Sequence, residues 1–124
     1  MASTDEMVEA FAAALTGKDS DAFVGVLAPG AVVWHNYDRK VVDARENMAA
    51  VEMLGQIVDD ASLETLKLAP TADGFVLRFV VHATVKGSGK PFEMQNAIVV
   101  TTDDGLITRI DEYVDPTVGA QLAP

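Results

Sequence analysis

Glu112 is a carboxylate with apolar neighbours in a stretch that is typical of a strand. Ile110 and Val114 flank it at two-residue spacing, so the pleat of a strand places all three side chains on one face. Apolar surroundings raise the pKa of a carboxyl group, whereas a nearby protonated histidine lowers it. A histidine oriented by such a carboxylate can act as a general base, and His82 is the candidate partner. The alternative is that Glu112 is a rim carboxylate of an acidic protein.

His82 lies in the long alternating stretch 75–86, and its orientation is open. One face of that strand carries only apolar side chains, while the other carries Arg78, His82 and Lys86 among others. On periodicity alone, the second face meets water and His82 is a surface histidine. A catalytic role for His82 requires this face to point into a cavity instead.

The stretch 32–38, VVWHNYD, holds the only tryptophan and one of the two histidines of the chain. Trp34 and Asn36 share one face of the expected strand, and His35 and Tyr37 share the other. Because a shift of one residue exchanges the two faces, only one of these pairs can line a cavity unless a bulge intervenes. The preference of tryptophan for burial favours Trp34 and Asn36 inward. His35 remains a second candidate.

Asn96 shares a strand face with Met94 and Ile98 in the stretch 92–102. An amide N–H group can donate to a developing oxyanion without needing a shifted pKa. One interpretation of Asn96 is therefore an amide that stabilises an oxyanion. The other is an asparagine that bonds to backbone at a bend in the strand.

Three helices and five strands are expected to position these residues. N-cap signals at Ser3, Asp19 and Asp43 begin three helices, each followed by apolar residues at helical spacing. Two-residue alternation and turn residues then mark the strands. The order α-α-β-α-β-β-β-β, with an antiparallel meander last, indicates an α+β fold in which helices cover one face of a curved sheet. The expected strands are 31–37, 62–69, 75–86, 92–102 and 106–114.

The composition limits the size and the partners of the protein. The 124 residues, 49% hydrophobic and 23% charged, predict a single globular domain over 1–124, with a core at about 5–115 and an irregular tail at 116–124. Nine basic and nineteen acidic residues give a net charge of −10, which argues against nucleic acid and anionic membranes as partners. No apolar run reaches the roughly 18 residues of a membrane helix, and the acidic N-terminus predicts no export signal.

The chain contains no cysteine, which excludes disulfides, thiolate catalysis and zinc–sulfur sites. The two histidines and Glu112 do not have the spacing of a metal site. We therefore expect a cytoplasmic protein that uses no metal and no cofactor.

The order of these segments resembles the nuclear transport factor 2-like superfamily, and in particular its SnoaL-like, ketosteroid isomerase-like and limonene epoxide hydrolase-like branch. The resemblance spans about residues 5–115 and rests on ALTGKDSDAF, VVWHN, DARENM, the turn ADG, and DDGLITRIDEYVD. It implies a cone in which a mostly antiparallel sheet wraps around helices and encloses a deep apolar pocket, and it implies a homodimer. The family includes isomerases, polyketide cyclases, epoxide hydrolases, dehydratases and non-catalytic members, so the fold alone does not give the function.

The resemblance also implies site residues. The catalytic arginine and one catalytic aspartate of the epoxide hydrolases match Val80 and His82, positions that face into the cone, and the second aspartate matches Glu112. Because the arginine is missing here, standard epoxide hydrolase chemistry is not expected. The protonated aspartate of ketosteroid isomerase, which donates to an oxyanion, matches Asn96. The general-base aspartate of that enzyme matches His35 if no gap is placed in this strand.

Together these features predict a small cofactor-independent enzyme that transfers protons on a hydrophobic small molecule, as an isomerase, a cyclase, a hydratase or an epoxide hydrolase-like enzyme does. His82 is the expected base or acid, oriented by Glu112, and Asn96 with Asn36 or His35 would hold oxygen or water. The alternative is a non-catalytic module that binds a hydrophobic ligand or serves as a dimer scaffold. The expected substrate-binding residues are Trp34, Leu54, Val80, Thr84, Met94, Ile98 and Ile110.

Overall fold

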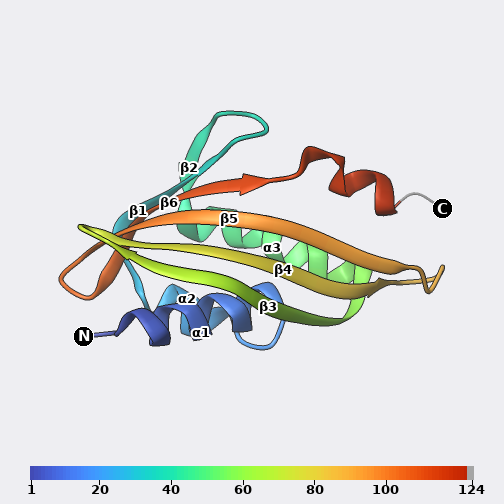
Figure 1. The fold of residues 1–124 in the computed structure, drawn as a ribbon, viewed down its shortest axis with the longest axis horizontal. Helices are drawn as coiled ribbons and strands as arrows, with labels where there is room; N and C mark the ends of the chain where they lie inside the picture. The colour runs from blue at the N-terminus through green and yellow to red at the C-terminus, as the bar shows by residue number, and fades with distance from the viewer. Residues whose placement is uncertain (123–124) are drawn as a thin grey trace.

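Alternating apolar residues in the second half of the chain help to form one curved, unclosed sheet, and the helices pack against one of its faces (Figure 1). This architecture is seen in a computed structural model that describes residues 1–122. The expected α+β fold is confirmed. The elements in chain order are α1 (Thr4–Leu15), α2 (Ser20–Val24), β1 (Leu27–His35), β2 (Val41–Asp43), α3 (Ala44–Ile57), β3 (Val58–Thr71), β4 (Gly74–Val85), β5 (Pro91–Asp103), β6 (Leu106–Val114) and the 3₁₀ helix η1 (Pro116–Leu122).

N-cap side chains begin all three α-helices, as the sequence predicts. Ser3 Oγ accepts a hydrogen bond from the Glu6 N–H, and the Glu6 carboxylate accepts one from the Ser3 N–H, both at 3.1 Å. Asp19 and Asp43 accept in the same way from backbone N–H groups of the first helical turn. These bonds satisfy donors that a helix otherwise leaves without partners, and they fix where each helix begins.

The strands lie in the order β2-β1-β6-β5-β4-β3, and every neighbouring pair is antiparallel except β1 and β6. Because β1 and β6 run parallel, their C-terminal ends meet at the same end of the sheet. In this register His35 lies beside Glu112, and Val33 lies beside Ile110. A histidine and a carboxylate from distant parts of the sequence thereby become neighbours.

The core lies between the helices and the sheet face that they cover, which we call the inner face. Phe11 of α1 packs edge-to-face against Phe23 of α2, with 5.6 Å between ring centroids, and against Phe79 of β4 at 5.4 Å. Each such ring pair contributes about 1 kcal/mol beyond the area that it buries. The inner face of β4 consists of alternate buried residues, namely Phe75, Leu77, Phe79 and Val81.

The short strand β2 is absent from the predicted order. It pairs with β1 after the turn at 36–40 and is only three residues long, too short to show a period of two. The tail 116–124 also differs from its expectation, because Pro116–Leu122 forms a 3₁₀ helix; residues 123 and 124 lie outside the described residues. None of the helices within residues 1–122 has the length and apolar character that a membrane span requires.

Strand β3 is longer than the predicted segment 62–69. Its pairing with β4 shifts register between Asp59 and Ser62 and again between Thr65 and Lys67. Each shift interrupts the alternation of inner and outer side chains, which is the signal that marks a strand in a sequence. For this reason, the alternation in the sequence does not show at which residues β3 begins and ends.

Candidate active site

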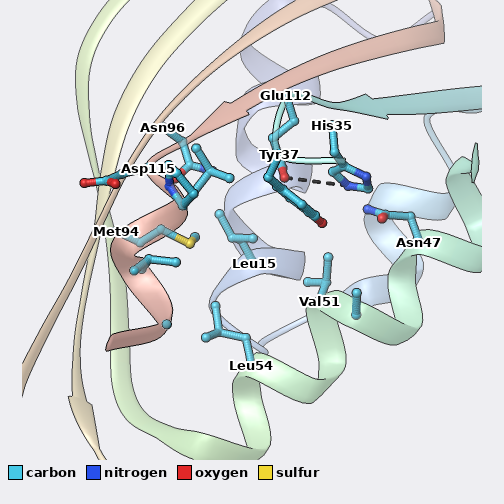
Figure 2. A pocket seen from close by; sticks show the side chains of 15 residues that line it. Leu15, His35, Tyr37, Asn47, Val51, Leu54, Met94, Asn96, Glu112 and Asp115 are labelled. Atoms are coloured by element: carbon cyan, nitrogen blue, oxygen red, sulfur yellow. Dashed lines mark ion pairs between the residues drawn. The ribbon is translucent and has the colours of Figure 1, made fainter. Parts of the chain in front are cut away.

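A cavity of about 410 Å³ opens at the end of the sheet where β1 and β6 finish (Figure 2). Its wall combines the inner face of β5 and β6, the helix α3, the last residue of α1 and the beginning of η1. The volume lies within the range of small-molecule sites. The lining residues are Leu15, His35, Tyr37, Asn47, Ala50, Val51, Leu54, Met94, Asn96, Glu112, Val114, Asp115, Pro116, Val118 and Gly119.

His35 and Glu112 form an ionisable pair in the wall of this cavity. His35 Nε2 lies 3.8 Å from Glu112 Oε1, and the two side chains are 7% and 19% exposed. Their closeness follows from the parallel register of β1 and β6, which sets the two residues side by side on the inner face. Burial raises the pKa of the Glu112 carboxyl, and the charge of His35 opposes part of that rise. The pair is therefore suited to exchange a proton with a bound molecule.

Tyr37 covers the His35 ring at the edge of the cavity. The two rings stack with 5.0 Å between centroids and 26° between planes. Partial burial raises the pKa of the Tyr37 phenol, and the nearby carboxylates of Glu112 and Asp38 raise it further. The phenol thus keeps its proton and can donate a hydrogen bond to a bound molecule.

Asn96 lies on β5, and its side chain points to the same face of the sheet as that of Glu112. Its pairing partner on β6 is Val114, and its side chain lines the cavity together with that of Met94 (Figure 2). Asn96 is 8% exposed, and its Oδ1 atom is buried without a hydrogen-bond donor in residues 1–122. The alternative interpretation, an amide that bonds to backbone, is not seen for this oxygen.

Two sets of hydrogen bonds hold the walls of the cavity in place. The Arg45 guanidinium of α3 donates to the carbonyls of Leu27 and Ala28, at 3.1 and 3.0 Å, and so ties α3 to β1. The Gln121 amide of η1 pairs with the backbone of Glu93 on β5, accepting from its N–H at 2.9 Å and donating to its carbonyl at 2.7 Å. These bonds fix the two helices that face each other across the opening.

The expected pairing of His82 with Glu112 is wrong. The pleat of β4 sends Phe79 and Val81 into the core, so His82 points to the opposite, outer face of the sheet. There His82 Nε2 lies 2.8 Å from Glu64 and Nδ1 lies 3.5 Å from Glu93, in partly exposed surroundings. The periodicity of β4 indicated this orientation, whereas the match to the epoxide hydrolases did not.

The prediction that Trp34 and Asn36 line the cavity is also wrong. Trp34 lies on the outer face, where it packs edge-to-face against Tyr113 with 5.4 Å between centroids. The Asn36 side chain accepts from the Val114 N–H at 3.0 Å and donates to the Val114 carbonyl at 3.2 Å, which makes it an extension of the sheet. Pairing with β6 sets this register, and the second candidate, His35, faces inward.

The remaining predicted binding residues divide into three groups. Leu54 and Met94 line the cavity. Ile98 and Ile110 point inward but are buried in the core beyond the cavity. Val80 and Thr84 alternate with the inward residues of β4 and share the outer orientation of His82, which corrects their expected place in the pocket.

The sequence did not identify Asn47 or Asp115 as residues of the cavity wall. Asn47, Val51 and Leu54 follow one another at helical spacing on α3, so the apolar stripe of that helix could have revealed the position of Asn47. Asp115 precedes η1 and accepts from the Thr117 N–H and hydroxyl, at 2.9 and 2.7 Å. Its position depends on where η1 packs, which no local pattern predicts.

No group of three histidine, aspartate or glutamate side chains is arranged around a possible metal ion in the part of the chain that the structure describes. What the cavity does present is one histidine–carboxylate pair, one buried amide and an apolar wall. Such an arrangement can move a proton and hold one oxygen or nitrogen atom of a ligand.

Residues 8–110 match the family model of the SnoaL-like domain. The chain belongs to this family. The matched segment contains α3, the strand that carries His35, and the amide Asn96. It ends just before Glu112, so the carboxylate of the pair lies outside the matched region.

Solved structures share the fold of this SnoaL-like domain at low sequence identity. A protein with a ketosteroid isomerase-like fold from Catenulispora acidiphila, in complex with trimethylamine, is 23% identical, with a TM-score of 0.77 over 96% of this chain and 93% of that one. IdmH from Streptomyces antibioticus, described as a candidate polyketide cyclase, is 20% identical, with a TM-score of 0.81 over 96% and 97% of the two chains.

An NTF2-like protein from Burkholderia thailandensis is 21% identical, with a TM-score of 0.77, and the two chains cover each other completely. No curated protein matches the chain. At this level of identity the comparisons establish the fold of the SnoaL-like domain, and the chemistry must be argued from its own cavity.

Proposed function

We propose that this protein is a small enzyme that isomerises or cyclises a hydrophobic small molecule by proton transfer. The observation that carries the proposal is the buried pair of His35 and Glu112, 3.8 Å apart, on the wall of a cavity of about 410 Å³. A base enclosed by apolar walls acts on a bound molecule rather than on bulk water. The fold shared with a ketosteroid isomerase-like protein and with a candidate polyketide cyclase supports the same class of reaction.

In this proposal three side chains share the steps of the reaction. The neutral imidazole of His35 removes a proton from a carbon next to a substrate carbonyl, and the electrons of the C–H bond form the enolate. The Glu112 carboxylate stabilises the imidazolium that results. Return of the same proton to another carbon of the enolate system completes an isomerisation. Attack of the enolate carbon on a second carbonyl carbon of the same molecule opens that C=O double bond, and the resulting alkoxide takes the proton back from the imidazolium, which completes a cyclisation. Asn96 holds an oxygen atom of the substrate at the other end of the cavity.

Exchange of carbon-bound hydrogen for deuterium tests this proposal without knowledge of the natural substrate. 2-Tetralone and a small panel of other uncharged cyclic ketones are incubated with the protein in D₂O, and exchange next to the carbonyl is followed by NMR. We expect the wild-type protein to accelerate exchange of at least one ketone. His35→Gln and Glu112→Gln should each reduce that acceleration by about 100-fold or more, because each removes half of the acid–base pair.

His82→Gln is the matched control, since it removes the other histidine from the outer face. Its exchange rate should stay within about twofold of the wild-type rate, and circular dichroism should show all variants folded. If His35→Gln exchanges as fast as the wild type, His35 is not the base. If no ketone in the panel exchanges faster than in buffer, the proton-transfer proposal fails and a module that only binds its ligand is favoured.

A further inference from the structure

The carboxylate of Glu112 is mostly buried and receives no hydrogen bond from residues 1–122. Its side chain is 19% exposed, and its ion-pair partner, His35 Nε2, lies 3.8 Å away, which is too far for a hydrogen bond. Both carboxylate oxygens are nevertheless accessible, because Asn96 Oδ1 is the only fully buried side-chain oxygen or nitrogen without a partner in residues 1–122. A carboxylate that has lost much of its water needs donors, and a ligand in the cavity can supply them.

The charges around the cavity favour a positive ligand. The lining contains two acidic residues, Glu112 and Asp115, and among the described residues it contains neither lysine nor arginine. Hydrogen bonds from the Thr117 N–H and hydroxyl hold the pKa of Asp115 below its usual range, so this carboxylate is negative at neutral pH. The whole chain carries a net charge of −10. A cation in the cavity is therefore attracted, whereas an anion is repelled.

The rest of the wall suits an apolar body attached to that cation. Leu15, Leu54 and Met94 supply aliphatic and thioether surface to the same cavity (Figure 2). Tyr37 stacks on the His35 ring with 5.0 Å between centroids, yet it is 55% exposed, so aromatic surface remains accessible at the edge of the cavity. The face of an aromatic ring attracts an ammonium group. The cavity thus combines a carboxylate, an aromatic ring and an apolar wall.

We propose that the cavity binds a protonated amine with an apolar body, and that the ammonium group donates a hydrogen bond to the Glu112 carboxylate. A hydrogen bond between charged groups is about twice as strong as a neutral one, so the ammonium is preferred over a hydroxyl on the same body. The inference goes beyond the proposed function, because binding of the amine needs no turnover. Since the ammonium takes the carboxylate that would stabilise the His35 imidazolium, such an amine inhibits the proposed proton transfer.

Two naphthalene probes with one skeleton test this inference by calorimetric titration at neutral pH. 2-Naphthylmethylamine carries an ammonium group where 2-naphthylmethanol carries a hydroxyl, and both groups can donate hydrogen bonds. We expect the amine to bind about tenfold more tightly than the alcohol. The preference should persist at about 0.3 M sodium chloride, because salt screens a mostly buried pair much less than surface charges. Equal affinities, no amine binding at about 1 mM, or a preference that disappears with salt would overturn the inference.

Glu112→Gln keeps the size of the side chain and removes its charge, so in this variant the preference for the amine should fall below about threefold. Glu52→Gln is the matched control, because Glu52 lies on α3, is exposed and lies outside the cavity lining. It changes the net charge of the protein by the same amount and should preserve the tenfold preference. If the preference persists in Glu112→Gln, or is lost in Glu52→Gln, the inference is wrong.

The two histidines locate the amine in the wild-type protein without any variant. His35 lies beside Glu112 in the cavity wall, whereas His82 lies on the outer face of the sheet. NMR signals of the His35 ring should shift as the amine is added, with the Kd that calorimetry gives, and those of His82 should stay in place. Shifts at His82 without shifts at His35 would put the amine outside the cavity and refute the inference.

These titrations do not depend on turnover, so the two proposals can fail separately. In a protein that exchanges ketones, saturating amine should inhibit the exchange competitively; exchange at an unchanged rate would refute amine binding at Glu112 and leave proton transfer standing. An amine preference that Glu112→Gln abolishes, in a protein that exchanges no ketone, would support the ligand class and refute the enzyme.

Discussion

The charge of Glu112 depends on its neighbour. Burial favours the protonated carboxyl, and a protonated His35 favours the carboxylate. In the proposed reaction, the carboxylate beside His35 stabilises the imidazolium that forms when the ring takes a proton from a carbon atom.

The raised pKa of Glu112 also makes the stability of the protein depend on pH. The unfolded chain has the ordinary glutamate pKa of 4.5, and burial raises the pKa in the folded state. Below 4.5 the carboxyl is neutral in both states; as the pH rises from there through the folded-state pKa, ionisation increasingly favours the unfolded chain. Glu112→Gln cannot ionise, so its melting temperature minus that of the wild type should increase with pH over this window.

Thermal unfolding of both proteins in a series of buffers from pH 4 to pH 8 measures this difference. The comparison of the two proteins at each pH cancels the contributions of the other carboxylates. A difference that stays constant, or that shrinks as the pH rises, would contradict the claim that burial dominates at Glu112.

Several site residues could be predicted from the sequence because strand alternation fixes their face. Glu112, Asn96 and Met94 point inward as their apolar neighbours indicate. The choice between Trp34 and His35 could not be made locally, since both faces of that strand carry large side chains and only the pairing with β6 decides between them.

At the scale of the elements, the close approach of β4 and β5 depends on a glycine. A Cβ atom at Gly74 would collide with the backbone carbonyl of Val100 on β5. A collision with backbone cannot be relieved by a change of rotamer, so one of the two strands has to move. The strand pairing that carries Asn96 begins at this point.

Gly74→Ala should therefore destabilise the protein by about 1–3 kcal/mol. Gly55→Ala is the matched control: Gly55 lies within α3 and a Cβ there would meet no atom within 4 Å. Because alanine is the better helix former, this control should stabilise the protein by about 0.5–1 kcal/mol. Urea unfolding of both variants gives the two free energies, and a neutral Gly74→Ala would show that the strands can separate at little cost.

The helices could be predicted well, because their caps are written in short local motifs such as Ser3 with Glu6. The parallel pairing of β1 with β6 could not be predicted, because no turn connects these two strands and no local motif in either strand indicates which strand it pairs with. The 3₁₀ helix η1 could not be predicted for the same reason. Its hydrogen bonds from Gln121 to β5 join segments that are far apart in the chain.

At the scale of the whole molecule, charge is the property with the widest effect. Nineteen acidic residues against nine basic ones leave a net charge of −10, and few ion pairs offset it in residues 1–122. Repulsion among these charges destabilises the folded state more than the expanded unfolded chain. Added salt screens that repulsion, since the Debye length falls from about 30 Å at 0.01 M to about 10 Å at 0.1 M.

The melting temperature should therefore rise by about 3 °C when sodium chloride increases from 0.01 to 0.3 M at neutral pH, which corresponds to roughly 1 kcal/mol. Differential scanning calorimetry at several salt concentrations measures it. A melting temperature that falls with salt would mean that attractive ion pairs outweigh the net repulsion. The homodimer and the cytoplasmic location that the family resemblance and composition favour remain predictions.

The position of Trp34 determines what the intrinsic fluorescence of this protein reports. Trp34 is the only tryptophan in the chain, and its ring lies against Tyr113 on the outer face, with the sheet between it and the cavity. Indole emission responds to the polarity of its immediate surroundings. A ligand that enters the cavity should leave the emission nearly unchanged, whereas a second molecule that covers the outer face should shift it to shorter wavelength. Emission recorded against protein concentration is thus a direct optical assay of self-association, independent of what the cavity holds.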